Sequence, residues 1–354
     1  MKIQITGIIK GIVNSSLLFC LIWNSPVAYC QKKKAEPAPA QSDAGKQQLE
    51  LAISRLSAIA GGIVGVSAIH VESGKRIVQN GQDHFPLAST FKVPVAIALL
   101  MKVDSGKYGL DQLFELEDSD LSPGGGMISA RFRWPGSQKP GLALSVRSLL
   151  ELNLLISDNT AADFCMELAG GPSSVTASLK GMGIEDLRVD RPTKMTITNY
   201  LGLEIAPTDK WSPAQFDTLV KKITPEMEKA SGKIFNDDIR DTSTPEAMSE
   251  LLLKLFTQPI LKPESKSLIL DIMRRCETGP NRLKGLLPPG TEVRHKTGTI
   301  GMTTNDVGIM TLPGDAGHVV ISVFVKSSDK KVEDRERAIA EISRTVYDYF
   351  LINR

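Results

Sequence analysis

Histidine and cysteine are scarce in this chain, with four residues of each among 354. No group of them has the spacing of metal ligands, so the sequence predicts no metal and no other cofactor. Two of the cysteines lie in the first thirty residues, which leaves Cys165 and Cys276 for the folded part. These two could form one disulfide. Because Cys165 lies within a helical apolar pattern, we expect instead two free, buried cysteines that act as small hydrophobic residues.

An excess of charge of one sign is also absent, because 42 Lys and Arg residues oppose 40 Asp and Glu residues. Aromatic residues make up only 5% of the chain and do not interleave with basic runs. Nucleic acid is therefore excluded as an expected partner. The remaining composition, 42% hydrophobic and 23% charged, is typical of a globular protein with one large domain or two modest ones.

No apolar run is long enough to span a bilayer. Residues 12–27 are mostly apolar and follow two lysines, but Asn, Ser and Pro interrupt them. With the small residues that follow, this pattern predicts a secretory signal over residues 1–30, an exported protein that is periplasmic or secreted, and no stable membrane span after processing. A lipid anchor on Cys30 is the weaker alternative, since Tyr29 stands where a small residue is wanted.

The rest of the chain divides by composition. Residues 31–46 are rich in Lys, Ala, Pro and Gln and predict a flexible linker, so the folded domain is expected over 47–354. Strand patterns occur at both ends of this domain, whereas helical patterns dominate residues 93–287. The expected fold class is α+β: an antiparallel sheet flanked by N- and C-terminal helices, with an inserted all-helical subdomain. The expected helices are 47–59, 93–100, 145–156, 160–168, 213–223, 245–256 and 330–349. The expected strands are 64–71, 76–79, 292–296, 306–312 and 318–325.

Ser89 stands at the start of the helix expected over 93–100 and is followed three residues later by Lys92. Residues three apart lie on one face of a helix, so the lysine amine should reach the serine. Serine is a weak nucleophile that needs a base, which predicts Ser89 as nucleophile and Lys92 as base. Unpaired N–H groups at a helix start can bind a developing oxyanion, and the Thr299 amide is the expected second donor.

Ser157 and Asn159 belong to a Ser-Asp-Asn segment that precedes a helical pattern. The Ser157 hydroxyl could pass a proton to a leaving nitrogen. The Asn159 amide could orient either a substrate amide or the catalytic lysine. Both residues are therefore candidates for one active site with Ser89.

A Lys-Thr-Gly segment lies on a predicted strand late in the chain. Lys296 would supply positive charge opposite a substrate carboxylate, and the hydroxyls of Thr297 and Thr299 would bind the same group. Gly298 has no Cβ and would let the ligand approach the strand closely. These four residues form the predicted substrate-binding edge.

Each of these segments has an ordinary structural interpretation when it stands alone. A Ser-x-x-Lys sequence is a common start of a helix, Ser-Asp-Asn is common in turns, and Lys-Thr-Gly can end a strand. Here all three occur in the order and the contexts that serine acyl-transfer enzymes use. Their combination therefore favours the catalytic interpretation.

With these residues identified, the chain resembles the class A serine β-lactamases over roughly residues 46–354. His295 replaces the commoner acidic residue before the Lys-Thr-Gly lysine. The resemblance implies hydrolysis of β-lactams through an acyl-enzyme on Ser89, no cofactor, and a monomer whose partner is a small β-lactam or a peptidoglycan stem peptide. Further matching segments are 157–163, 170–172, 241–248, 278–279, 285–288 and 305–306.

One departure concerns the Ω-loop, where the family carries a glutamate that activates the deacylating water. Two alignments place either Thr193 or Met195 at that position, and neither side chain is a base. An additional segment of some thirty residues, about 201–235, follows. Within it Glu204 is the candidate deacylation base. Two further glutamates, Glu226 and Glu228, have the alternative interpretation of a solvated helix face among lysines.

Loss of the loop glutamate keeps two rivals open. A D-Ala-D-Ala peptidase or penicillin-binding protein uses the same acylation machinery on peptidoglycan and deacylates slowly after reaction with a β-lactam. A ligand-sensing domain that remains acylated is the weaker rival, because no signalling segment accompanies the catalytic core.

Overall fold

The computed structural model describes residues 41–131, 141–203 and 213–353. Its main sheet has five antiparallel strands in the order β2-β1-β9-β8-β7. The first strand of the chain therefore pairs with the last, from Ile63 opposite Lys326 to His70 opposite Val319. The strands are β1 (Ile63–His70), β2 (Arg76–Gln79), β7 (Val293–Ile300), β8 (Thr303–Thr311) and β9 (His318–Lys326).

Helices cover both faces of this sheet. The terminal helices α1 (Gln41–Ala60) and α12 (Val332–Ile352) contribute Ile53 and Phe350 to a hydrophobic core on one face. The helix α10 (Pro245–Thr257) contacts β1, β8 and β9, and its Leu251 belongs to a second core. Because the sheet is covered on both sides, β1 is buried along nearly its whole length and consists mainly of apolar residues.

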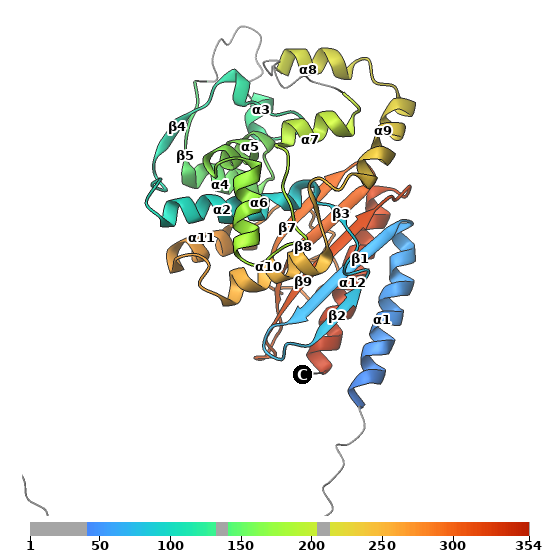
Figure 1. Cartoon of the computed structure of the whole chain (residues 1–354). Coiled ribbons are helices and arrows are strands. Elements are labelled where there is room, and N and C mark those ends of the chain that lie inside the picture. Colours follow the sequence, from blue (N-terminus) through green and yellow to red (C-terminus); the bar gives the residue numbers. More distant parts are fainter. Residues whose placement is uncertain (1–40, 132–140, 204–212, 354) are drawn as a thin grey trace, which may run out of the picture. The chain divides into compact units, whose positions relative to one another are not determined.

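The second core is formed mainly by residues of the segment between β2 and β7, together with side chains of β1, β8 and β9. Figure 1 shows the helices of this segment grouped together beside the sheet. The centre of this core is α2 (Lys92–Asp104), which is buried all round from Lys92 to Leu100 and is accordingly apolar on every face. Polar side chains fix where its neighbours begin: Ser145 caps α4 and Asp158 caps α5 through bonds from backbone amides. The remaining helices of this region are α3 (Met127–Arg131), α4 (Val146–Leu155), α5 (Asn159–Leu168), α6 (Pro172–Gly181), α7 (Thr193–Tyr200), α8 (Pro213–Val220), α9 (Pro225–Asp237) and α11 (Pro263–Arg274).

The α+β fold class and the sheet built from distant segments are confirmed, but the expectation of an all-helical insertion is wrong in detail. Four short strands occur between β2 and β7 in two pairs, and three of them, β4, β5 and β6, lie within residues 93–287. Runs of two or three residues are too short to show alternation. The linker prediction is also too long, because α1 begins at Gln41. The short strands are β3 (Phe85–Pro86), β4 (Leu113–Glu115), β5 (Ala143–Ser145) and β6 (Thr242–Ser243).

Candidate active site

Ser89 lies in the short 3-10 helix η1 (Ala88–Phe91), directly before α2. Asn305 of β8 holds the preceding segment, since its Nδ2 donates to the carbonyls of Pro86 and Leu87 at 2.8 and 3.0 Å. Ala88 adopts a left-handed conformation with φ 44°, which non-glycine residues rarely do. Such backbone strain concentrates where a side chain must be aimed at a ligand. Ser89 is thus presented at the start of the helix, as predicted.

Lys92 is fully buried beneath the serine. Its Nζ donates to the Ser157 carbonyl at 2.7 Å and to Asn159 Oδ1 at 2.8 Å, and lies 3.1 Å from Ser157 Oγ. These hydrogen bonds link Lys92 to Ser157 and Asn159, and the hydrogen bonds of the described residues include none between Lys92 and Ser89. Burial and the nearby charge of Lys296 hold the pKa of Lys92 well below its usual value. The amine is therefore prepared to be neutral.

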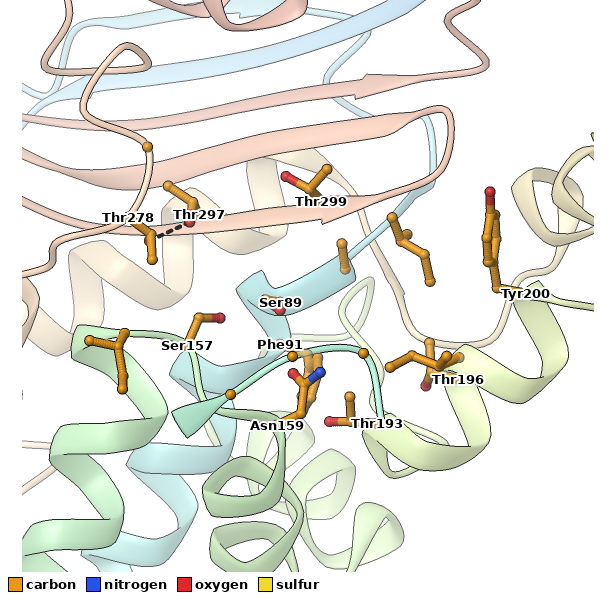
Figure 2. Close-up of a pocket in the computed structure, with 18 of the residues that line it drawn as sticks. Ser89, Phe91, Ser157, Asn159, Thr193, Thr196, Tyr200, Thr278, Thr297 and Thr299 are labelled. Atoms are coloured by element: carbon orange, nitrogen blue, oxygen red, sulfur yellow. Dashed lines mark hydrogen bonds between the residues drawn. The ribbon is translucent and has the colours of Figure 1, made fainter. Parts of the chain in front are cut away.

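The Ser157 hydroxyl lies between two lysines. Lys296 Nζ donates to Ser157 Oγ at 2.9 Å, opposite the contact with Lys92. Burial lowers the pKa of Lys296 to about 8. Ser157 has φ 60°, a left-handed conformation that carries about 1–3 kcal/mol of strain. This backbone geometry aims the hydroxyl at the space beside Ser89 (Figure 2).

The strand β7 forms the opposite wall of the site. Thr297 and Thr299 line the cleft, whereas the fully buried Lys296 lies behind it with its amine on Ser157. A Cβ at Gly298 would come within 2.8 Å of the Leu87 carbonyl and 3.0 Å of the Ser89 amide. The missing side chain thus makes room for the Ser89 turn, whereas the sequence analysis assigned that space to a ligand.

Arg282 is a cleft residue that the sequence analysis missed. Its guanidinium is buried behind β7 and donates to Thr299 Oγ1 at 2.7 Å and to the Gly298 carbonyl at 3.1 Å. Glu336 of α12 pairs with its Nε at 3.0 Å. The arginine therefore adds a permanent positive charge to the same end of the cleft as Lys296. The available sequence signal for Arg282 was its position three residues after Thr278-Gly279, a pair that the sequence analysis had already matched to the family.

A cleft of about 510 Å³ joins these elements. Five predicted residues line it from three separate parts of the chain, and Figure 2 shows Ser89, Ser157 and Thr299 facing the same space. The predicted residues that line the cleft are Ser89, Ser157, Asn159, Thr297 and Thr299. Lys92, Lys296 and Gly298 support them from behind.

The helix α7 closes the cleft on the side where the family places its glutamate. Thr193, Thr196 and Tyr200 line this wall, and no described lining residue is a carboxylate or a histidine. Thr193 Oγ1 is buried without a hydrogen-bond partner among the described residues. The part of the chain that the structure describes therefore supplies no general base on this wall.

The glutamates of the additional segment divide into two cases. Glu204 lies outside the described residues. Glu226 and Glu228 are exposed on α9, and Glu228 accepts a hydrogen bond from the Tyr200 hydroxyl at 3.0 Å. The alternative interpretation of a solvated helix face is thus confirmed for these two.

Buried carboxylates attach this loop to the rest of the domain. Asp163 of α5 accepts bonds from the Thr193 and Lys194 amides at 2.5 and 3.1 Å, which fixes the start of α7. Asp241 accepts from the Arg191 amide at 3.0 Å and from its Nε at 2.5 Å. These bonds hold the start of α7 against α5 and against the segment before β6, so the described residues of α7 form a fixed wall of the cleft.

Cys165 and Cys276 are both free and buried, as expected from the sequence. Burial raises the pKa of the Cys165 thiol, which is consistent with an inert core residue. The Cys276 thiol differs and is considered below.

A serine at the head of a buried helix, a hydroxyl held between two lysines and a cationic strand edge define the class of active-site serine enzymes that form acyl intermediates. The chain belongs to the β-lactamase enzyme family, whose family model matches residues 48–350. This match covers nearly the whole described region and confirms the resemblance drawn from the three motifs.

Named relatives and solved structures agree with this membership. The chain is 29% identical to β-lactamase VEB-1 of Pseudomonas aeruginosa, covering 88% of this chain and 93% of the relative. It is 28% identical to the extended-spectrum β-lactamase PER-1 of the same organism, covering 97% and 96%. A β-lactamase of Chitinophaga pinensis superposes with TM-score 0.68 at 30% identity, covering 85% and 98%. An ancestral class A β-lactamase gives TM-score 0.68 at 31% identity, covering 85% and 99%.

Proposed function

We propose that this enzyme hydrolyses β-lactam antibiotics through an acyl-enzyme on Ser89. The observation that carries the proposal is the position of Ser157 Oγ, 3.1 Å from Lys92 Nζ and 2.9 Å from Lys296 Nζ at the cleft that Ser89 lines. Family membership and the names of the relatives support the substrate class. The relatives named above are all β-lactamases, so the peptidase alternative is not favoured.

The contacts of Lys92 suggest how protons move during acylation. A neutral amine has two N–H groups, which the Ser157 carbonyl and Asn159 Oδ1 accept, so its lone pair is left toward the hydroxyls of the site. Ser89 Oγ attacks the lactam carbonyl and its proton passes to Lys92. As the C–N bond breaks, Ser157 donates its proton to the lactam nitrogen and takes one back from Lys92.

Binding uses the two sides of the cleft. The Ser89 and Thr299 amides would bind the oxyanion of the tetrahedral intermediate. The substrate carboxylate would lie at the end of β7 where Thr297 and Thr299 line the cleft, with the charges of Lys296 and Arg282 directly behind them. Neither step needs a metal or a cofactor.

Paired assays of the purified enzyme test the proposed function. We expect a penicillin to be opened to its penicilloic acid with many turnovers per enzyme molecule, and a D-Ala-D-Ala peptide to remain uncleaved. Mass spectrometry of the product and of the intact protein distinguishes turnover from a permanent adduct. Cleavage of the peptide with a single, never-released penicillin adduct would establish the peptidase instead.

Lys296→Ala should weaken recognition of substrates that carry a carboxylate. The variant removes a charge-assisted contact usually worth ~1.5–3 kcal/mol, so the second-order acylation constant should fall by roughly 10- to 150-fold. Because the pKa of Lys296 is about 8, the wild-type constant should also fall as pH rises through that value. A β-lactam whose carboxylate is esterified is the matched control and should lose much less. Equal losses for both substrates would contradict the assigned role.

Export is the second part of the proposal. It rests on the predicted signal over residues 1–30, which lies outside the described residues. Within the described ranges, no helix has the length and apolar character needed to cross a membrane. Fractionation of cells that express the full chain would test export, and activity confined to the cytoplasm would contradict it.

A further inference from the structure

Three side chains form a buried cluster behind the cleft strand β7. Cys276 follows α11, His295 lies on β7 and Asp306 lies on β8. His295 Nδ1 lies 2.9 Å from both oxygens of the Asp306 carboxylate, and both side chains are fully buried. His295 Nε2 is buried without a hydrogen bond of regular geometry among the described residues, and the Cys276 thiol is the other side chain that interacts with this ring.

The charges of the cluster follow from this arrangement. Burial lowers the pKa of His295, but Asp306 and Cys276 outweigh it and raise the value to about 9. Burial raises the pKa of the Cys276 thiol, but the hydrogen bond and charge of His295 outweigh it and lower the value to about 7. Near neutral pH the imidazole is therefore charged, and the thiol is close to its midpoint between S–H and thiolate.

A chain of hydrogen bonds connects this thiol to the cleft. Cys276 Sγ lies 3.3 Å from Thr278 Oγ1. Thr278 Oγ1 in turn lies 2.6 Å from Thr297 Oγ1, and Figure 2 shows this second hydrogen bond. Both threonines line the cleft. Each hydroxyl has a single hydrogen, so the direction of the first bond in the chain determines the direction of the second.

We propose that Cys276 is a positioning residue that sets the direction of this chain and so determines whether Thr297 donates or accepts at the carboxylate end of the cleft. While the sulfur keeps its proton, S–H donates to Thr278, Thr278 donates to Thr297, and the Thr297 O–H is free for the substrate carboxylate. Once the sulfur is a thiolate, Thr278 donates to it and Thr297 donates to Thr278. The lone pairs of Thr297 then face the substrate carboxylate and repel it. The inference rests on the proposed function, because it concerns recognition of the β-lactam carboxylate.

The elements packed around Cys276 carry four further cations. Lys296 of β7 helps to lower the thiol pKa, and Lys284 Nζ donates to the Cys276 carbonyl at 3.1 Å. Arg275 and Arg282 each form ion pairs with carboxylates. The partners are Asp271 and Glu151 for the first and Glu336 for the second. Lys296 has a higher pKa, about 8, so its own titration follows that of the thiol.

Cys276→Ser tests the proposal, because a serine hydroxyl keeps its proton throughout this pH range. The measurement is the second-order acylation constant for a carboxylate-bearing penicillin. At pH about 6 the variant and the wild type should have similar acylation constants, because in both proteins the chain of hydrogen bonds runs from residue 276 toward Thr297 and leaves the Thr297 O–H free for the substrate. A pH of about 7.5 lies between the pKa of the Cys276 thiol and the pKa of Lys296. At this pH only about a quarter of the wild-type molecules keep S–H. The variant should then be about fourfold faster.

Two further variants separate this role from a general effect of replacing a buried cysteine. Thr278→Val breaks the chain of hydrogen bonds but keeps the thiol. Its acylation constant should therefore no longer fall as the thiol loses its proton. Cys165→Ser removes the other buried thiol, and its acylation constant should still fall as the Cys276 thiol loses its proton. Thiolate absorbance in the ultraviolet, measured in the Cys165→Ser protein, should appear as pH rises through about 7.

The outcomes separate this inference from the proposed function. If the ratio of Cys276→Ser to wild type is the same at both pH values while acylation proceeds, the inference is overturned and the function stands. A thiolate signal absent until well above neutral pH would overturn it equally. A wild-type enzyme that no β-lactam acylates would overturn the proposed function itself.

Discussion

Ser89→Ala should abolish covalent labelling by any β-lactam and lower turnover by on the order of 10⁶-fold, the loss expected when a catalytic serine is removed. The reason is that the proposed mechanism joins the acyl group to Ser89 Oγ. The side chain is half-buried at the cleft and contributes little to either core, so the folded state should keep its stability. Intact-mass spectrometry after incubation with a penicillin measures the labelling directly.

Ser105→Ala is the matched control for this variant. Ser105 lies just past the other end of α2 and is exposed. It should retain full labelling and a similar melting temperature. Undiminished labelling of Ser89→Ala would show that another group is the nucleophile and would end the assignment.

A chromogenic cephalosporin should give a stoichiometric burst followed by slow steady-state turnover. Acylation needs the residues around Ser89, which are all in place, whereas hydrolysis of the ester needs a water held by a base. The α7 wall offers only Thr193, Thr196 and Tyr200 among the polar side chains that the structure describes there. A general base accelerates such a step by ~10²–10⁴-fold, so deacylation should be slower by about that factor than in an enzyme that has this base. Stopped-flow absorbance shows the burst, and a mass adduct on Ser89 should persist for seconds or longer.

Substitutions in the additional segment distinguish the two explanations for a different result. If turnover is fast and has no burst, Glu204→Gln should convert the enzyme to the slow behaviour. Glu226→Gln serves as the control, because its side chain is exposed on α9 and should leave turnover unchanged, whereas Glu228→Gln also removes the acceptor of the Tyr200 hydroxyl. Fast turnover that survives all three substitutions, made one at a time, would contradict this account of the loop.

Much of the site could be predicted because its chemistry depends on short local patterns. A serine before an apolar helix, a Ser-Asp-Asn cap and a Lys-Thr-Gly strand each fix a backbone conformation as well as a side chain. Those segments carried the prediction of Ser89, Ser157 and Lys296. Long amphipathic helices and buried strands were predictable for the same reason, since their period of 3.6 or 2 repeats over many residues.

What the sequence did not reveal depends on contacts between distant segments. Arg282 reaches the cleft only because the loop that carries it packs behind β7. Lys92 bonds to Ser157 and Asn159 because the start of α5 lies beside it. Gly298 is required by the Ser89 turn, 209 positions earlier in the sequence. None of these relations leaves a periodic signal along the chain.

The pairing of β1 with β9 has a consequence for how the enzyme becomes active. Contacts between residues so far apart are closed late in folding, because the chain entropy lost in joining them is recovered only when the sheet forms. During synthesis β1 is made early. Its partner β9 becomes available only after nearly the whole chain has been made. The edge strand β7, which carries Lys296 and completes the cleft beside Ser89, belongs to the same late sheet. We therefore expect chains that end before β7 to lack the strand wall of the cleft, so that Ser89 is left without its binding partners until this sheet has formed.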